Sequence, residues 1–291
     1  MSSQALAFKS KTKRKPASFY LSSIAVYAVA VIVLIFFVYP LVNTIIGSLK
    51  TYEDFTNTPQ YALPTKLYFG NYVEVFKNNF GKYFLNSVLV AFLVVLFTVI
   101  LSAMASFAIS KFKFRRKRLV EIFFLLGLMV PYQVVLLPLY LTYAQLNLLN
   151  SYFSLILPQV AFGMPFSIQL FLAFFSEYDD AMIEAAVIEG CGITNAFLKV
   201  VVPMCRNIII TIATLRAIFA WNEYIFSYTF VNSKAMMTVV LGLNAFVGEE
   251  GVIDWGPTFA AITVTVIPTL IVYMFLGKYM QSGLSEGSVK G

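Results

Sequence analysis

One short segment of this sequence combines charged, amide and aromatic side chains within an otherwise apolar stretch. Arg216 and Glu223 are the only charged residues within the predicted hydrocarbon core, and Trp221 and Asn222 stand between them. On a continuous helix, residues seven apart share one face and lie about 10 Å apart along the axis. An ionisable side chain inside a membrane usually faces a protein interior or a wet cavity and has a partner. The segment therefore marks a candidate path or gate, or else a structural charge pair.

Several kinds of chemistry are excluded by residues that the sequence lacks. It has no histidine, so a Ser-His or Cys-His nucleophile, a histidine-ligated metal and a histidine proton relay are impossible. Cys191 and Cys205 fall in one predicted cytoplasmic loop, where thiols stay reduced, and we interpret them as structural. A glycine-rich phosphate loop ending in Lys-Ser or Lys-Thr is also missing. The sequence therefore predicts no catalytic residue, metal or cofactor, and no ATP hydrolysis by this chain.

The composition indicates a polytopic, all-α membrane protein. Hydrophobic residues make up 59% of the chain and charged residues 12%, which leaves too little polar surface to cover a soluble globule of this size. Apolar runs of about twenty residues are long enough to cross a bilayer. The first run is too long for a cleaved signal peptide, and no small-residue cleavage site follows it. Six spans are predicted, at residues 22–48, 86–110, 119–141, 152–175, 207–229 and 257–278.

The third, fourth and sixth predicted spans carry Pro131, Pro138, Pro158, Pro165 and Pro268. A proline in a spanning helix frees a carbonyl that neighbouring groups must satisfy, so these helices are expected to pack within protein and to bend there. Such bends serve either a moving part or the architecture alone.

The orientation in the membrane follows from the positions of the basic residues. Of the 21 Lys and Arg, fifteen fall on one side of the six spans, five fall on the other, and Arg216 lies within a span. The larger group includes the basic tail at residues 1–21 and the connection KFKFRRKR. By the positive-inside rule this side is the cytoplasm, which places both termini there. The charge of +7 is explained by this topology better than by nucleic-acid binding.

A polar interruption, EAAVIEGCGITNAFLKVVVPM, lies in the cytoplasmic loop at residues 176–206. Strong helix formers run up to Gly190, which can take the left-handed conformation that ends a helix. A second short helix is expected from Thr194, as N-cap, to Val202, where Pro203 stops it. The predicted structure of the loop is helix, glycine turn, helix.

The first of these short helices has an apolar arc that needs a surface to cover it. Its members are Met182, Ile183, Ala185, Ala186 and Val187. A helix lying on the membrane would be expected to carry lysines on its polar face, whereas this one carries acids. A groove in a partner protein is therefore favoured over the membrane surface.

The loop closely resembles the EAA loop of permease subunits of ATP-binding-cassette (ABC) importers. The matching residues are Glu184, Ala185, Ala186, Gly190 and Pro203. The likeness continues in FLNSVLVAF, MPFSIQLFLAFF, WNEY and IPTLIVYMFLGKYMQSGLSEGSVKG, and the last points to the MalG-like permeases of carbohydrate importers, in the binding-protein-dependent transport system family. The sequence departs from the pattern at Glu189, at Cys191 and at Asn207, where a second proline is frequent, which leaves the exit angle of the loop open.

The resemblance implies a division of labour among subunits. In the family, this loop is the coupling helix that docks on an ATP-binding subunit, and the C-terminal tail reaches between two such subunits. The tail at residues 281–291 would contribute Gly283, Gly287, Lys290 and Gly291, unless it is only a frayed terminus. The implied partners are a second, MalF-like permease, two ATP-binding subunits, an extracytoplasmic solute-binding protein and a sugar.

The resulting prediction is a sugar-importer permease in the cytoplasmic membrane of a prokaryote, with residues 22–280 as its transmembrane domain. Within it, Glu223, Asn222 and Trp221 could line the sugar path, or the charges at Arg216 and Glu223 could pair structurally or with the second permease. A structural or gating role is slightly favoured. The competing class is a secondary transporter or channel that works alone.

Overall fold

The computed structural model of the chain describes residues 17–177, 181–246 and 253–286. Every regular element in these residues is helical, as the sequence predicts. Four helices are long and apolar enough to cross a membrane, and the number rises to six if two sharply bent helix pairs each count as one span. The long helices are α1 (Ala17–Gly47), α4 (Phe80–Lys111), α7 (Tyr152–Glu177) and α14 (Trp255–Glu286).

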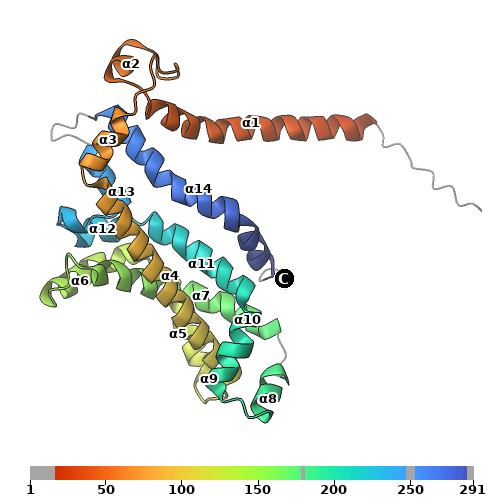
Figure 1. Cartoon of the computed structure of the whole chain (residues 1–291). Helices are drawn as coiled ribbons and strands as arrows, with labels where there is room; N and C mark the ends of the chain where they lie inside the picture. The colour runs from red at the N-terminus through yellow and green to blue at the C-terminus, as the bar shows by residue number, and fades with distance from the viewer. Residues whose placement is uncertain (1–16, 178–180, 247–252, 287–291) are drawn as a thin grey trace, which may run out of the picture.

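The centre of the fold is formed by α4, which packs along α7 and along α11 (Arg206–Trp221). Figure 1 shows these helices together with α14, which lies against α11. The buried face of α4 is built from small and β-branched side chains that let neighbouring helices approach closely. This face includes Ser87, Val90, Ala91, Val94, Thr98, Ser102, Ala103 and Ser106.

The third predicted span is broken. Its two halves, α5 (Lys117–Gly127) and α6 (Tyr132–Gln145), meet at an angle of 95°. Pro131 stands at the break in an extended conformation and has no N–H to continue the first helix. The bend expected at Pro131 is therefore present, and the single span predicted at 119–141 consists of two helices.

The fifth predicted span, 207–229, is also interrupted, close to its C-terminal end. The helix α11 ends at Trp221, and a separate short helix, α12 (Ile225–Phe230), follows after three residues. The cause is local: the side chain of Glu223 accepts hydrogen bonds from backbone amides of α12 and so begins a new helix. The periodicity of apolar residues in the sequence does not reveal that a side chain begins a new helix here.

On the side of the predicted outer loop, the segments beyond the ends of the spans are held in place by hydrogen bonds of buried polar groups. The short helices α2 (Tyr52–Asn57) and α3 (Gly70–Lys77) occupy the predicted outer loop, and α4 begins six residues before the expected start at 86. The ammonium of Lys50, only 1% exposed, donates to the carbonyls of Pro59 and Gln60. Near α14, this side also contains the turns Lys234–Met236 and Leu243–Phe246 and the helix α13 (Val239–Gly242).

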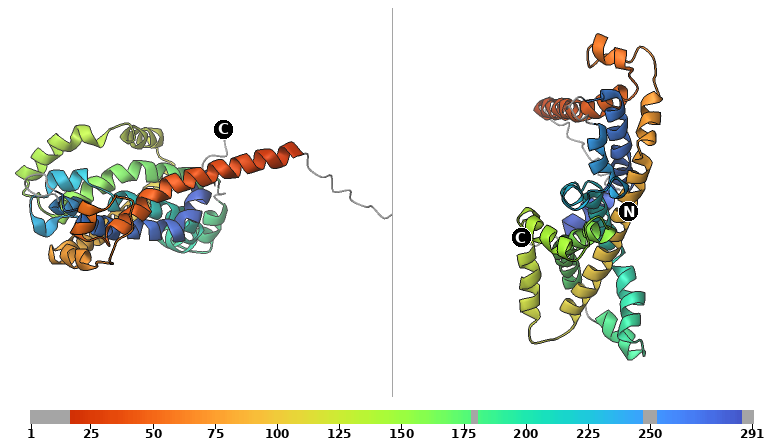
Figure 2. Two further views of the ribbon diagram at one scale, coloured as in Figure 1. Left: turned by 90° about the horizontal axis from the view of Figure 1, so that it is seen from above. Right: turned by 90° about the vertical axis from the view of Figure 1, so that its left-hand side faces the viewer.

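The first and last helices differ from their predicted spans in different ways. The spanning part of α1 has no buried residues, and Figures 1 and 2 show the helix extending away from the others. Its last turn reaches α14, where Gly47 lies against the ring of Phe259. At the other terminus, α14 continues to Glu286, past the expected end at 278 and into the tail predicted at 281–291.

Candidate translocation cavity and coupling loop

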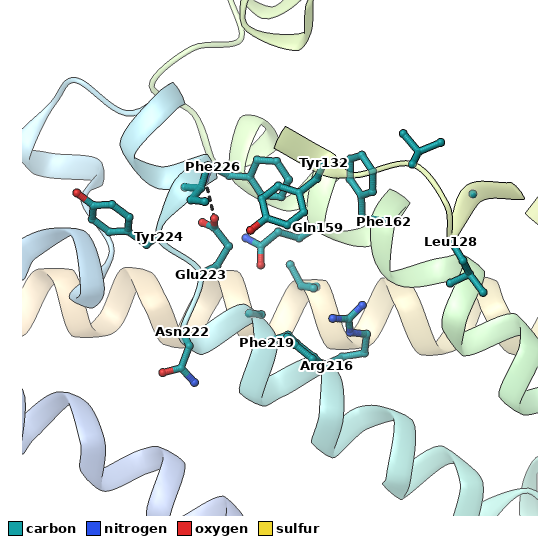
Figure 3. A pocket seen from close by; sticks show the side chains of 15 residues that line it. Leu128, Tyr132, Gln159, Phe162, Arg216, Phe219, Asn222, Glu223, Tyr224 and Phe226 are labelled. Carbon is teal, nitrogen blue, oxygen red and sulfur yellow. Dashed lines mark hydrogen bonds between the residues drawn. The ribbon is translucent and has the colours of Figure 1, made fainter. Parts of the chain in front are cut away.

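A cavity of about 650 Å³ lies where the two broken spans approach α7. Its wall includes the break between α5 and α6, the break between α11 and α12, and part of the length of α7. Figure 3 shows its side chains from close by. The lining residues are Val94, Gly127, Leu128, Val130, Tyr132, Gln159, Phe162, Arg216, Phe219, Ala220, Asn222, Glu223, Tyr224, Ile225 and Phe226.

Glu223 is held at this cavity by the start of α12. One carboxylate oxygen accepts from the backbone N–H of Phe226 at 2.6 Å. The other accepts from the backbone N–H of Ser227 at 3.1 Å and from its hydroxyl at 3.2 Å. Charge-assisted bonds of this kind at a helix N-terminus stabilise both the anion and the helix. The position of the carboxylate is therefore fixed within this chain.

Gln159 is a lining residue that the sequence analysis missed. It lies on α7, is 8% exposed, and donates from Nε2 to the carbonyl of Leu155 at 2.8 Å. Figure 3 shows its amide between the carboxylate of Glu223 and the guanidinium of Arg216. The available signal was a glutamine within the apolar span 152–175.

Arg216 enters the same cavity from α11. Its guanidinium carbon lies 4.9 Å from the ring centroid of Phe219, and its Nη1 atom occupies space left by the missing side chain of Gly163. Its Nε atom is buried without a hydrogen-bond partner in the described part of the chain. The expectation that Arg216 and Glu223 share one helix face is wrong, because the helix ends before Glu223. Both residues do line one cavity. The carboxylate of Glu223 has hydrogen-bond partners within the chain, whereas Nε of Arg216 has none among the described residues.

The other two predicted residues of this segment point elsewhere. Trp221 does not line the cavity: its indole N–H donates to the carbonyl of Thr265 at 2.9 Å, and its ring packs edge-on against Phe84. Asn222 lines the cavity, but its amide turns back to the carbonyl of Ile218 and lies away from the carboxylate of Glu223 (Figure 3). The aromatic contribution to the cavity comes from Tyr132, Phe162 and Tyr224 instead.

The predicted helix, glycine turn and helix are present at the opposite end of the molecule from α2, as Figure 2 shows. The first helix, α8 (Ala181–Ile188), ends in the hydrogen-bond pattern of a Schellman motif. The amide of Cys191 donates to the carbonyl of Ala186, and the amide of Gly190 donates to that of Val187. Gly190 has φ 87°, the left-handed conformation expected from the sequence.

The second helix of the loop differs from the prediction at both ends. Its N-cap is Gly192 and not Thr194, and it runs through α9 (Ile193–Ala196), a π-helical turn (Phe197–Val201) and α10 (Val202–Met204). Pro203 is included in the helix, which ends one residue later at Met204, two residues past the expected end at Val202. The chain then bends by 77° between Met204 and Arg206.

Most of α8 is exposed. Met182 is 53% exposed and Val187 is 48% exposed, whereas Ile183 packs toward a buried cluster that includes Phe174 and Val201. Glu184 and Ala185 are also exposed, and Ala186 is partly buried. The fold of this chain therefore leaves much of the predicted apolar arc uncovered.

Of the predicted tail residues, Gly283 lies within α14. Gly287, Lys290 and Gly291 lie outside the described residues, as does Asp180 beside α8.

The chain thus has helices suited to crossing a membrane, two interrupted spans beside a largely apolar cavity with a few polar groups, and an exposed helical hairpin at one end. These features define a membrane transport component. Residues 99–286 match the family model described as "Binding-protein-dependent transport system inner membrane component". The chain belongs to this family and is an integral protein of the inner membrane. The predicted resemblance to permease subunits of ABC importers is thereby confirmed, and the alternative of a transporter that works alone is not favoured.

Two relatives match nearly the whole chain. The probable ABC transporter permease protein YurM of Bacillus subtilis is 33% identical over 288 residues, which cover 99% of this chain and 94% of YurM. The trehalose/maltose transport system permease protein MalG of Thermococcus litoralis is 32% identical over 266 residues, which cover 90% of this chain and 95% of MalG.

A solved structure has the same fold. It is part of a bacterial ABC transporter involved in the import of the acidic polysaccharide alginate, and it superposes with a TM-score of 0.80. The match covers 92% of this chain and 99% of that chain, at 21% sequence identity. The overall arrangement of the helices is therefore one already seen in a solved structure.

Proposed function

We propose that this chain carries a sugar or oligosaccharide across the cytoplasmic membrane as one permease of an ABC importer. The observation that carries the proposal is the cavity between the broken spans. It presents a carboxylate, a carboxamide and a phenol, from Glu223, Gln159 and Tyr132, beside the aromatic rings of Phe162 and Tyr224. Polar groups of this kind bind hydroxyl groups, and aromatic faces pack against the apolar faces of sugar rings.

The size of the cavity fits this class of solute. Its volume of about 650 Å³ lies within the range of about 300–1,000 Å³ that is usual for small-molecule sites. The likeness to a trehalose/maltose permease over 90% of the chain supports a sugar over other solutes of the same size.

The proposed partners are a second permease, two ATP-binding subunits and an extracytoplasmic solute-binding protein. The uncovered α1 and the exposed arc of α8 support the need for protein partners, because this chain covers neither. Both termini and α8 would face the cytoplasm, in keeping with the positive-inside distribution of basic residues. The outer helices α2 and α3 would then face the binding protein's side.

In this complex α8 would act as the coupling helix. Glu184, Ala185 and Ala186 would enter a cleft of an ATP-binding subunit, Gly190 would set the reversal of the chain, and Pro203 would lie where the loop returns to the bundle. The 77° bend before α11 supports a mechanical link, since α11 carries Arg216 and leads into Glu223 at the cavity. The C-terminal residues Gly283, Gly287, Lys290 and Gly291 would add a further contact with the ATP-binding subunits.

The test is purification of the tagged chain in mild detergent, followed by reconstitution with a loaded binding protein. We expect a second permease and two copies of an ATPase to co-purify, and sugar uptake to require ATP. An active, ATP-independent transporter made of this chain alone would contradict the proposal. A complete complex that transports no sugar of any size would contradict the solute assignment only.

A further inference from the structure

A second cavity, of about 520 Å³, lies at the end of the molecule near α8, where the end of α4, the start of α5 and the end of α7 come together. It is separate from the cavity that contains Glu223 and shares no lining residue with it. Its lining residues are Ser110, Lys117, Arg118, Glu121, Ile122, Leu125, Gln169, Leu172, Ala173 and Ser176.

We propose that this cavity binds the headgroup of an anionic phospholipid from the adjacent membrane leaflet, in the manner of phosphatidylglycerol. The two cations, Lys117 and Arg118, outnumber the one carboxylate, Glu121, so the lining has a net positive charge. Basic pockets between spanning helices are suited to anionic lipid headgroups. The site goes beyond sugar transport and does not depend on which solute the importer carries.

An unpaired amide within the cavity points to a ligand. The Nε2 atom of Gln169 is buried and has no hydrogen-bond partner among the described residues. A buried donor without a partner is unfavourable, so an acceptor supplied by a ligand would stabilise the cavity. A phosphate oxygen or a headgroup hydroxyl supplies such an acceptor.

The other polar groups are arranged to share such a ligand. Lys117 donates to the carbonyl of Ser110 at 3.1 Å, which holds its ammonium against the end of α4 and leaves two further N–H groups. Arg118 is exposed at the mouth of the cavity and offers a planar fork for a phosphate. The hydroxyl of Ser176 donates to the carbonyl of Ala173, so its oxygen can still accept from a headgroup hydroxyl.

The apolar side of the cavity distinguishes a lipid from a soluble anion. Ile122, Leu125 and Leu172 continue the lining along the facing sides of α5 and α7, toward the middle of these membrane helices. Leu125 is 51% exposed and Ile122 is 44% exposed, so this surface is open to an acyl chain. A free phosphate uses the basic end of the site only, whereas a phospholipid uses both ends.

The test measures lipid binding to the complete importer by native mass spectrometry, with added phosphatidylglycerol or phosphatidylcholine. We expect phosphatidylglycerol to bind more tightly, and Arg118→Gln to weaken it about fivefold. Arg115→Gln is the matched control, because Arg115 lies in the same basic loop but does not line the cavity. Equal loss in both variants, equal binding of both lipids, or no retained lipid would overturn the proposal.

A second variant separates binding from folding. In Gln169→Leu an unpaired amide is replaced by an apolar side chain of similar size, so melting without added lipid is expected to be unchanged or higher. The increase in melting temperature caused by phosphatidylglycerol should shrink. A lower melting temperature without lipid would show that the amide is structural and would overturn the proposal. So would full stabilisation by inorganic phosphate, because the ligand would then be a soluble anion.

Discussion

The segment that follows α11 and the loop around α8 differ in whether the chain itself supplies partners for their side chains. After α11, both carboxylate oxygens of Glu223 accept hydrogen bonds from Phe226 and Ser227 of the same chain. At α8, the side chains of Met182 and Val187 remain exposed. The polar groups of the first region have their partners within the chain, whereas the second region leaves apolar side chains exposed.

The difference separates two sources of function in a transport subunit. A group that is fixed within the chain can define the geometry of a solute cavity before any partner binds. An apolar face that is still exposed can contribute free energy when a partner docks and buries it. Changes in the first region should therefore reduce the amount of folded complex, and changes in the second should uncouple a complex that still forms.

The largest expected effect is that of Glu223→Leu. The substitution leaves the amides of Phe226 and Ser227 without their charged acceptor, and a buried donor left without a partner typically costs about 1–3 kcal/mol. We expect a strong fall in the yield and melting temperature of the detergent-extracted importer. Glu223→Gln, which keeps an acceptor oxygen, should fall less.

Asn222→Ala is the matched control at the neighbouring position, because the exposed Asn222 amide bonds only to the carbonyl of Ile218 among the described residues. Normal yield of Glu223→Leu would break the comparison, since the carboxylate would then not be required by the fold.

The next effect is that of Gly190→Val in the coupling loop. A left-handed residue with a side chain is disfavoured by about 1–2 kcal/mol, and more if it is β-branched, although no atom lies within 4 Å of the added Cβ. We expect normal permease abundance, a several-fold fall in sugar uptake, and loss of ATPase stimulation by the loaded binding protein.

Gly190→Asn tests the same position with a residue that tolerates the left-handed conformation. It should retain most of the uptake. Wild-type uptake by the valine variant would make the loop a passive connection and withdraw the coupling role from Glu184 to Gly190.

A smaller effect is expected from Gly163→Ala, which tests the position of Arg216, whose Nε has no hydrogen-bond partner among the described residues. An added Cβ would lie 2.7 Å from Nη1 and 3.2 Å from Cδ of Arg216. Because the end of the arginine can move, the change should cost about 1 kcal/mol, at the low end for overpacking. Uptake should fall modestly and recover when Arg216→Gln is added.

Gly277→Ala in α14 is the control for this substitution, since its Cβ would meet no atom within 4 Å. It should be neutral or slightly stabilising. If both glycine variants behave alike, the position of Arg216 has no bearing on transport.

The smallest effect concerns Asp54, a second carboxylate satisfied within the chain. Its pKa is lowered from 3.8 to about 2, chiefly because the hydroxyl of Thr65 donates to it, with further bonds from Thr51 and the Thr65 amide. The stabilisation is present above pH 3.8 and is lost as the pH falls through about 2. Pepsin cleavage of the outer segment should therefore accelerate across this interval.

Asp54→Asn should remove that pH dependence while leaving α11 and α12 unaffected. Cleavage at an equal rate at pH 4 and pH 2 in the wild type would show that the outer segment does not depend on this carboxylate.

The sequence predicted features that depend on neighbouring residues or on composition. Six apolar runs gave the positions of the spans, and Gly190 was identifiable because a left-handed residue is a local requirement. The break at 222–224 was not predicted, because a side chain that caps the next helix leaves the apolar pattern unchanged. The break at Pro131 was visible as a proline, but its angle depends on the packing of α5 and α6 against neighbours.

The cavity was predicted only in part for a different reason. Arg216 and Glu223 were recognisable as charges in an apolar segment, and both line it. Gln159 comes from another helix, so its place beside them depends on how α7 crosses α11. Trp221 was misplaced because the direction of an indole on a helix is set by its partners, here Thr265 and Phe84.

The contact between Gly47 and Phe259 has a consequence for the order of synthesis. Helix α1 packs against α14, although more than 200 residues separate Gly47 from Phe259 in the chain. Contacts of such long sequence separation form late, because loop closure precedes any gain from the contact. During translation α1 therefore lacks this contact within the chain until α14 has been synthesised. Truncation before residue 255 should leave a subunit that inserts but is cleared by membrane proteases.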